Sequence, residues 1–436
     1  MNQERKVAFA ATIGTIIEQY DFFIYNTAAA LVFSKLFFPQ VSPAIGTMLA
    51  FSTSATGFAA RPIGAIVSGH FGDRVGRKAL LLATILIMGI ATFAIGLLPT
   101  YDSIGIAAPI ALLTLRVIQG FAVGGEFGGA SLMISESVPA NRRGVWGSLI
   151  TVGILAGLII GTILFSSVTS LLSEDSFMSW GWRVPFLLSA VLVAVGIYVR
   201  VSIAETPEFL RMIATGRKAE NPLMEALKQP KSVITIFFMR VAENFSFYVF
   251  SAFSLSYIAG TLGLPRSLAL NAVMIASLVE CVTAIGFGAL ADRIGARRIM
   301  VGGLIFQMLF AFPFFWLLDT GNHGWVFVGI IIAFALCNGP ISAVQPGWLP
   351  RFFSVNSRAS GLALGRELAS VAGGGVAPLV ATALVSSAHS SWPVAAAMAG
   401  TTFLGLIAMI SVRQMDQEWS RQENERKSLG GTAVAS

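Results

Sequence analysis

A short charged motif occurs twice in this chain and divides it into two parts of nearly equal length. The copies read Gly69-His-Phe-Gly-Asp73-Arg74-Val-Gly76-Arg77-Lys78 and Gly288-Ala-Leu-Ala-Asp292-Arg293-Ile-Gly295-Ala-Arg297-Arg298. Asp73 and Asp292 are 219 positions apart in a chain of 436 residues. Each copy lies between two long apolar stretches, where a tight turn between membrane helices would fall. The chain is therefore predicted to be a tandem duplication, an organisation found in membrane proteins with parallel internal repeats.

Long apolar stretches fill most of the chain. Hydrophobic residues make up 55% of the sequence and charged residues only 12%, about half the charged share of soluble domains. A spanning helix needs about 20 largely apolar residues. About twelve stretches meet that length, near residues 9–34, 44–70, 79–99, 104–136, 144–171, 184–204, 232–261, 267–290, 298–318, 324–349, 358–387 and 392–412. The predicted fold is an all-α membrane protein with twelve transmembrane helices in two six-helix, pseudo-symmetric halves.

The polar segments set the predicted domain boundaries. The two halves are expected over residues 1–204 and 232–413, and residues 414–436 are expected to form a cytoplasmic tail. The segment 205–231 between the halves is expected to be a cytoplasmic linker, either an amphipathic helix on the membrane surface or a solvated connection. The first apolar stretch lacks an Ala-x-Ala cleavage site, so we expect it to remain as the first helix.

Basic residues predict the orientation in the membrane. Most of the 29 Lys and Arg lie near alternate ends of the apolar stretches and at both termini, whereas Lys35, Arg183 and Arg266 lie on the opposite side. By the positive-inside rule both termini are cytoplasmic, and the chain is placed in the bacterial cytoplasmic membrane. The net charge of +7 is attributed to this topology and to contact with anionic lipids in the bilayer, rather than to a nucleic-acid site.

Several classes of function find no support in the residue pattern. Cys281 and Cys337 both fall in apolar stretches, which argues against a disulfide framework. The chain has three His and no Cys/His cluster, so no metal site is expected. No nucleophile with an evident base, no phosphate loop and no appended signalling domain is present. The chain is therefore not expected to be an enzyme or to use a cofactor.

Function is expected among the ionisable residues inside the apolar stretches. Each costs at least about 2.5 kcal/mol at the centre of a bilayer unless it faces a partner or a water-filled cavity. Ten such residues are Glu18, Asp21, Glu126, Glu243, Glu280, Glu367, Arg61, Arg116, Arg240 and Arg366.

The first helix offers a candidate proton site. Glu18, Asp21 and Tyr25 are three and four positions apart and share one face. Two carboxylates this close cannot both ionise at low cost. Arg116 and Gln119 share a face of the fourth helix. Either Arg116 alternates between a carboxylate of the first helix and a substrate carboxylate, or it only neutralises that helix.

The second half offers further candidate substrate ligands. Arg240, Glu243 and Asn244 share a face of the seventh helix, where they either satisfy one another or bind substrate. Arg366 stands beside Glu367 in the eleventh helix, and adjacent residues diverge by about 100°, so at most one faces the centre of the cavity. Arg suits bidentate capture of a carboxylate. Gln345 in the tenth helix completes the predicted substrate-binding set, together with Tyr25, Arg116 and Gln119.

The repeated motif resembles the loop signature of the major facilitator superfamily. More narrowly, the chain is similar to the metabolite:proton symporter family of shikimate, α-ketoglutarate, citrate and proline/betaine carriers. The matching segments are Thr15-Ile-Ile-Glu18-Gln-Tyr20-Asp21-Phe-Phe-Ile-Tyr25, Arg61-Pro-Ile-Gly64, Arg116-Val-Ile-Gln119-Gly120-Phe-Ala-Val-Gly124-Gly125-Glu126, Glu136-Ser-Val-Pro139-Ala-Asn-Arg142-Arg143-Gly144 and Gly181-Trp182-Arg183-Val-Pro185-Phe. The resemblance covers nearly the whole chain.

The resemblance implies roles for particular residues. Asp21 and Arg116 match the acid and the arginine that couple proton movement in related sugar symporters, and Glu18 is the second candidate acid. A cytoplasmic gate is expected from Gly69, Asp73, Arg74, Arg77, Glu136, Arg142, Asp292 and Arg293. The chain departs from the family at Gln19, where Trp is usual, and at Gly365-Arg366-Glu367, where Gly-Tyr-Gln is usual. These changes indicate a cavity that differs from those of the named carriers.

We therefore expect a proton-coupled symporter that imports a small organic acid, such as a mono-, di- or tricarboxylate or a shikimate-like acid. Alternating access would arise from rocking of one half against the other, and a monomer is expected. The alternative is uptake of a zwitterion such as betaine or proline, which the Arg-rich spans disfavour. A drug exporter or a membrane sensor has less support.

Overall fold

The computed structural model describes residues 3–75, 77–124, 142–201, 227–353, 358–410 and 412. Within these residues, side chains are described outside 3–11, 68–81, 199–201 and 358–360. The predicted linker lies mostly outside the described residues, and the predicted tail lies wholly outside them.

The first half consists of long helices joined by short turns. Its helical elements are α1 (Gln3–Ala28), η1 (Ala29–Phe33), α2 (Ser34–Leu36), α3 (Pro43–Val75), α4 (Arg77–Leu97), α5 (Tyr101–Ile104), α6 (Ala107–Val123), α8 (Arg143–Leu171), α9 (Glu174–Ser179), η3 (Gly181–Arg183) and α10 (Val184–Val201). The π-helical turn η1 continues α1 into α2, so these three elements correspond to the first predicted stretch.

The second half repeats this plan with more irregular helices. Its elements are α13 (Pro230–Tyr248), η4 (Val249–Phe253), α14 (Ser254–Ser256), η5 (Tyr257–Thr261), α15 (Arg266–Ile294), α16 (Ala296–Asp319), α17 (His323–Ile332), η6 (Ala333–Asn338), α18 (Gly339–Trp348), η7 (Leu349–Phe352), α19 (Arg358–Ala369), η8 (Ser370–Gly375) and α20 (Ala377–Ala388). A last helix covers Trp392–Ile410.

The predicted twelve-helix fold is confirmed. Each apolar stretch corresponds to a helix or to consecutive helical elements in the described part of the chain. Within that part, eight helices are long and apolar enough to cross a bilayer, and Leu82–Leu97 and Ala107–Val123 are shorter apolar helices. Large apolar side chains such as Ile90, Val282 and Leu309 are more than 60% exposed. Such exposure is expected where a helix faces lipid rather than water.

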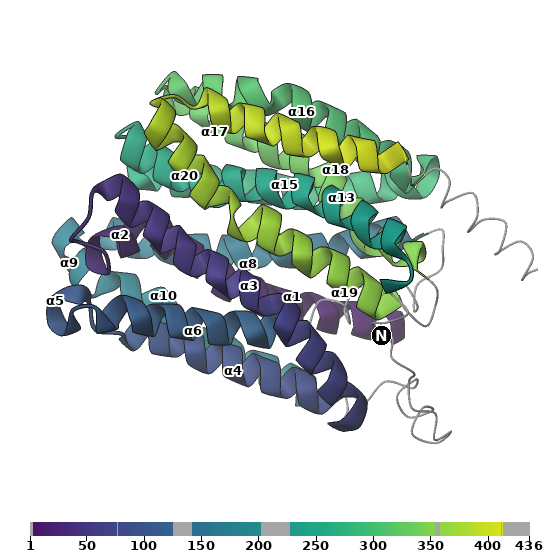
Figure 1. The fold of residues 1–436 in the computed structure, drawn as a ribbon, viewed down its shortest axis with the longest axis horizontal. Helices are drawn as coiled ribbons and strands as arrows, with labels where there is room; N and C mark the ends of the chain where they lie inside the picture. Colours follow the sequence, from purple (N-terminus) through teal and green to yellow (C-terminus); the bar gives the residue numbers. More distant parts are fainter. Residues whose placement is uncertain are drawn as a thin grey trace, which may run out of the picture.

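The two halves pack side by side (Figure 1). Helices of the first half, coloured purple to blue, fill the lower part of the view, and those of the second half, teal to yellow, fill the upper part. Between the halves, α8 packs along α15 and α18, and α3 packs against η8 and α20. The short helices α2, α5 and α9 lie at the end of the bundle opposite the chain's N-terminus. We call these ends the α9 end and the N-terminal end.

Small residues allow the helices of the first half to approach one another closely. Gly120 of α6 faces Gly57 of α3. A Cβ atom added at Gly120 would lie 1.8 Å from the carbonyl oxygen of Gly57. No side chain fits in that space, so the contact between α3 and α6 depends on glycine. This contact matters for function because it positions Arg61 of α3 and Arg116 of α6.

Replacing Gly120 by alanine is expected to lower the free energy of unfolding by about 1–3 kcal/mol, because α3 and α6 must separate. The matched control is Gly302→Ala on the exposed face of α16, where an added Cβ atom would meet nothing within 4 Å. Thermal unfolding in detergent measures both variants. Equal melting temperatures would contradict the close packing of α3 against α6.

Candidate functional site

Buried ionisable residues gather in the middle of the bundle. Of the ten predicted interior residues, Glu126 lies outside the described residues, and Arg240 is only partly buried. The others are at most 7% exposed: Glu18, Asp21, Arg61, Arg116, Glu243, Glu280, Arg366 and Glu367. Burial of so many charges requires partners, because an isolated charge in a low-dielectric interior is very costly. These partners divide into clusters.

In the first cluster, hydrogen bonds join Asp21 of α1 to Arg116 of α6 through Thr92 of α4 and Gln119 of α6. Thr92 of α4 donates to Asp21 Oδ2 at 2.8 Å, and Gln119 donates to the Thr92 hydroxyl at 2.6 Å. Arg116 in turn donates to Gln119 Oε1 at 3.1 Å and to Ser54 of α3 at 3.3 Å. A continuous chain of polar groups therefore connects Asp21 with Arg116.

Aromatic rings fill the space around the two arginines of the first half. The guanidinium carbon of Arg116 lies 4.2 Å from the ring centre of Phe22 and 4.1 Å from that of Tyr25. Arg61 lies 4.6 Å from the same Phe22 ring. The hydroxyl of Tyr25 hydrogen-bonds to Thr53 at 2.5 Å. Tyr25 therefore stabilises the charge of Arg116 by a cation–π contact with its ring.

A second cluster crosses the interface between the halves. Arg61 of α3 lies 3.6 Å from Glu18 Oε1 and 3.9 Å from Glu367 Oε2 of α19. Arg366 donates to Glu367 Oε1 at 2.7 Å. Ring contacts lie beside this ionic chain, with Phe58 packed edge-on against Tyr248 of α13. Arg61 thus links the predicted acid of the first helix to the charged pair of the eleventh.

The third cluster surrounds Arg240. Its Nη1 atom donates to Glu243 and, at 2.8 Å, to Gln345 Oε1, and its Nη2 atom donates to Asn244 at 3.2 Å. Asn244 contacts the Ser370 hydroxyl at 3.5 Å. The residues on the predicted face of the seventh helix are therefore paired within the protein, with Gln345 as an added partner, whereas Arg240 Nε has no partner among the described residues.

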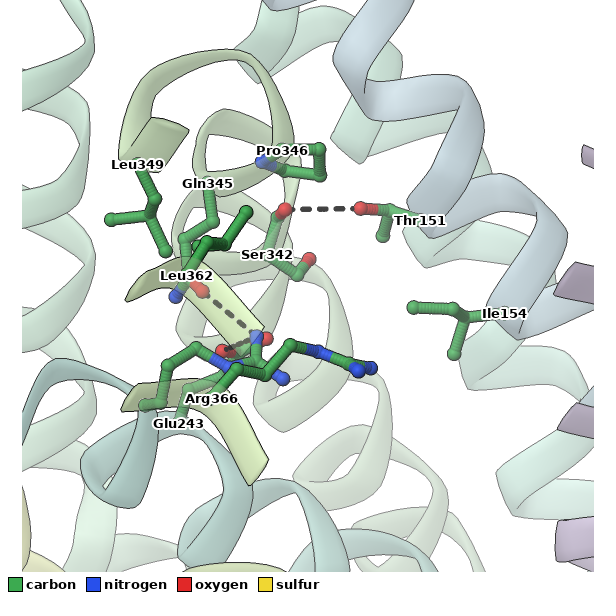
Figure 2. A pocket seen from close by; sticks show the side chains of 10 residues that line it. Thr151, Ile154, Glu243, Ser342, Gln345, Pro346, Leu349, Leu362 and Arg366 are labelled. Carbon is green, nitrogen blue, oxygen red and sulfur yellow. Dashed lines mark hydrogen bonds and ion pairs between the residues drawn. The ribbon is translucent and has the colours of Figure 1, made fainter. Parts of the chain in front are cut away.

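A small cavity lies where the halves meet (Figure 2). Thr151 and Ile154 of α8 line one side, and Ser342 and Pro346 of α18 face them. The remaining lining residues are Arg240, Glu243, Gln345, Leu349, Leu362 and Arg366. The cavity volume is about 20 Å³, which is room for about one water molecule. Ligand pockets usually measure about 300–1,000 Å³, so this conformation is closed around its centre.

The structure thus divides the predicted substrate residues into two groups. Arg240, Glu243, Gln345 and Arg366 line the cavity, and Asn244 bonds to the first of these. Tyr25, Arg116 and Gln119 lie in the first cluster, where they contact one another and the aromatic rings. Arg366 faces the cavity while its neighbour Glu367 pairs with the opposite half, as expected from their 100° divergence.

Both ends of the interface are closed by polar contacts. At the N-terminal end, Asp292 of α15 accepts hydrogen bonds from the backbone nitrogens of Gly144 and Val145, at 2.7 and 3.0 Å. Gly144 and Val145 lie in the first turn of α8, so Asp292 caps the N-terminus of a helix in the other half. At the α9 end, Arg266 of α15 forms an ion pair with Glu174 at 2.9 Å. Polar contacts therefore join the two halves at both ends of the interface.

The predicted gate is described only in part. Asp292 makes the interhalf contact given above, and Arg142 and Arg293 are exposed. Gly69, Asp73, Arg74 and Arg77 lie on α3 and α4, but their side chains are outside the described set. Glu136 lies outside the described residues.

Several polar neighbours were missing from the sequence prediction. They are Ser54, Thr92, Thr151 and Ser342, which connect the charged residues to one another or line the cavity. Single Ser and Thr residues are common in membrane helices and carry no signal on their own. The sequence also assigns no role to Arg61, although an arginine within a span is itself a functional signal.

Two six-helix halves, a small cavity between them with buried charged residues on its wall, and polar contacts between the halves at both ends define a membrane transporter rather than an enzyme. The chain belongs to the major facilitator superfamily, because the model of the Major Facilitator Superfamily matches residues 11–378. This match confirms the resemblance found in the sequence motifs.

Comparisons with individual proteins agree with this family. The chain is 41% identical to the shikimate transporter of Escherichia coli K12 over 395 residues, which cover 90% of each protein. It is 32% identical to the proline/betaine transporter of the same strain, over 94% of this chain and 83% of that one. Among solved structures, the xylose transporter XylE from E. coli, in a partially occluded inward open conformation, has a TM-score of 0.72 at 16% identity. That match covers 95% of this chain and 98% of XylE, and it supports the fold alone.

Proposed function

We propose that the protein is a proton-coupled symporter that imports a small organic acid into a bacterial cell. The observation that carries this proposal is the pair of cavity-lining arginines, Arg240 and Arg366, at the interface between the halves. Glu243 is the acid on the same wall, so the lining keeps an excess of positive charge that favours an anionic ligand. Each guanidinium group suits bidentate binding of a carboxylate. The proposed carrier is a monomer in the cytoplasmic membrane, with both termini in the cytoplasm.

The substrate class follows from the uncharged groups beside the arginines. Thr151, Ser342 and Gln345 place hydroxyl and amide groups on the cavity wall. Such groups suit a carboxylic acid that also carries hydroxyl groups, because buried polar ligand groups need partners. The shikimate transporter at 41% identity supports a hydroxylated cyclic acid of this kind. We therefore propose shikimate as the first compound to test.

Proton coupling is proposed at Asp21. Its bond to Thr92 and the chain through Gln119 to Arg116 supply a route by which protonation alters the position of a buried cation. Protonation of Asp21 removes its negative charge and would weaken the electrostatic attraction between Asp21 and Arg116 along these hydrogen bonds. The helices α1, α3, α4 and α6 could then rearrange around the substrate.

A zwitterion such as betaine is the second candidate. The proline/betaine transporter is 32% identical, and quaternary ammonium groups bind faces of aromatic rings. However, the ring of Phe22 already makes cation–π contacts with two arginines. The guanidinium carbons of Arg61 and Arg116 lie 4.6 and 4.2 Å from its ring centre. Among the described residues, none that lines the cavity carries an aromatic ring. The organic anion is therefore preferred.

A transport assay tests the proposal. Purified protein in liposomes, acidic outside and neutral inside, should accumulate labelled shikimate, and an uncoupler should abolish that accumulation. Related mono-, di- and tricarboxylates and betaine are tested as competitors. Thermal unfolding with each compound gives an independent measure, since a ligand at 100 times its dissociation constant stabilises by about 2.7 kcal/mol. If betaine is the only compound that stabilises the protein, the substrate is a zwitterion and the organic anion is the wrong class.

Alternating access requires that one closed end opens at a time. The cap that Asp292 places on α8 stabilises closure of the N-terminal end, which is proposed to be cytoplasmic. Loss of a helix cap costs about 0.5–2 kcal/mol. Asp292→Ala is therefore expected to increase the population open at this end by about two- to thirtyfold.

Cysteine labelling measures this shift. Thr151→Cys places a thiol in the cavity, in a background where Cys281 and Cys337 are replaced by serine. In inside-out vesicles, an impermeant maleimide should label this thiol faster when Asp292 is alanine. The matched control is Asp102→Ala, at an exposed aspartate in the first turn of α5, away from the interface. Equal labelling rates in both variants would count against the cap as a gate.

A further inference from the structure

A buried carboxyl group in the second half is not used by the clusters described so far. Glu280 lies near the middle of α15 and is 0% exposed. Its Oε1 atom accepts hydrogen bonds from Asn338 Nδ2 at 2.7 Å and from the Ser342 hydroxyl at 3.2 Å. Glu280 is therefore held by neutral donors.

Two polar atoms of this group lack a partner. Glu280 Oε2 and Asn338 Oδ1 are buried and have no hydrogen-bond partner among the described residues. Both atoms are acceptors if the carboxyl group is ionised. An ionised carboxylate here would also be buried without a cation, because no salt bridge joins Glu280 to a described basic residue. Such burial costs several kcal/mol per ion.

A proton on Glu280 resolves both deficits. A carboxylic acid and a primary amide form a cyclic pair in which the amide N–H donates to the acid carbonyl and the acid O–H donates to the amide oxygen. The bond from Asn338 to Oε1 is the first half of this pair. The atoms left over, Oε2 and Asn338 Oδ1, are the two that the second bond of such a pair would use. We propose that Glu280 is a second proton-binding site of the carrier, occupied in this closed conformation.

The site communicates with the cavity through Ser342. The Ser342 hydroxyl donates to Glu280, and the same residue lines the cavity opposite Thr151 of α8. The Thr151 hydroxyl donates to the Ser342 carbonyl oxygen at 3.0 Å. Opening of the interface at either end therefore brings water to Ser342. Protons can then exchange with Glu280 from the side that is open.

The electrostatic surroundings of Glu280 contain little charge. The groups that act on it are Glu243 of α13 and the thiols of Cys281 and Cys337. Glu243 is paired with Arg240. The other ionisable residues on the elements packed most closely against α15 lie at or near helix ends: Arg143, Tyr257, Arg297, Arg298, Asp319 and His323. Because no described basic residue pairs with Glu280, a bound proton is the positive charge that neutralises its carboxylate.

The inference rests on proton-coupled symport and predicts its stoichiometry. With protons at Asp21 and Glu280, each substrate crosses with two protons. At zero membrane potential, each coupled proton raises the equilibrium accumulation ratio about tenfold per unit of pH gradient. Glu280→Gln replaces the acid O–H by an amide N–H that can donate to Asn338. This variant mimics the protonated state permanently.

Infrared difference spectroscopy tests the proton directly, without any transport. The parent at neutral pH should show a carbonyl band of a protonated carboxyl group that is missing in Glu280→Gln. Asn338→Ala should shift that band without removing it, which assigns the band even if the first variant folds poorly. Glu174→Gln, the same change at a carboxylate 60% exposed, should leave it unaltered. Lack of the band in the parent, or no shift in Asn338→Ala, overturns the proposal.

Proteoliposomes test whether the proton is transported. With potassium and valinomycin clamping the potential at zero and one unit of pH gradient, Glu280→Gln should accumulate shikimate about tenfold less than the parent. Cys281→Ala, the adjacent residue on α15, should match the parent. An unchanged ratio in Glu280→Gln overturns the second proton while leaving symport intact. Failure of the parent to accumulate any tested acid refutes the proposed function instead.

Sodium is the other cation that the buried oxygen atoms around Glu280 could bind in place of a proton. Choline chloride in place of sodium chloride should leave the parent's melting temperature and transport unaltered. Stabilisation by sodium that disappears in Glu280→Gln would make this a sodium site and overturn the proton assignment.

Discussion

The Asp21→Asn, Glu280→Gln double variant is expected to lose all uphill accumulation of substrate in proteoliposomes while it still exchanges substrate across the membrane. Asparagine has the shape of aspartate and keeps an oxygen that accepts the bond from Thr92, which holds Asp21 at 2.8 Å in the parent. It cannot release a proton. Asp21→Asn alone is expected to lower the accumulation ratio about tenfold per unit of pH gradient, and the double variant to bring it to one.

The measurement compares accumulation under a pH gradient with exchange at equal pH on both sides. Exchange reports folding and binding, whereas accumulation reports coupling to protons. Glu18→Gln provides the comparison on the same helix, because Glu18 pairs with Arg61 rather than standing in the chain to Arg116. Full accumulation in Asp21→Asn, with loss of it in Glu18→Gln, would transfer the coupling role to Glu18.

Arg240→Lys is expected to weaken substrate binding by about ten- to hundredfold. The guanidinium group donates to Glu243, Gln345 and Asn244 while it lines the cavity. An ammonium group cannot hold these acceptors and also present a planar pair of donors to a carboxylate. Hydrogen bonds to charged groups contribute about 1.5–3 kcal/mol, which corresponds to that change in the dissociation constant.

Calorimetric titration with shikimate measures the effect. Arg366→Lys, at the other cavity arginine, should weaken binding in the same direction. The control is Arg266→Lys at the α9 end, where a lysine can keep the ion pair with Glu174. If both cavity variants bind as tightly as the parent, the organic anion is the wrong substrate class. Titration with betaine would then be the next experiment.

The fold was predictable because a bilayer restricts the backbone so strongly. A segment in hydrocarbon must satisfy its own hydrogen bonds, so long apolar stretches become helices. The limits of α15, predicted as 267–290, are Arg266–Ile294 in the structure. The duplication was visible because Asp73 and Asp292 recur in the same context. The π-helical turns were not visible, since they arise where a helix adapts to neighbours from other parts of the chain.

The candidate site was predictable at the level of residue type. A charge in a membrane span is costly, so Asp21, Arg116 and Arg240 stood out from their apolar surroundings. Helical spacing also showed that Arg116 and Gln119 share a face, and the structure has them hydrogen-bonded at 3.1 Å. Pairing between helices could not be predicted in this way, because helical periodicity describes one helix at a time.

The sequence by itself determined the helical membrane fold, the duplication and the identity of the interior charges, because each depends on local composition, repetition or hydrophobicity. Only the tertiary structure decided which charges meet. It joined Arg61 to Glu18 and Glu367 across the halves, placed Arg240 and Arg366 on one cavity, and paired Glu280 with Asn338. These contacts depend on the packing angles and rotations of helices far apart in the chain, which are set by side-chain complementarity over the whole bundle.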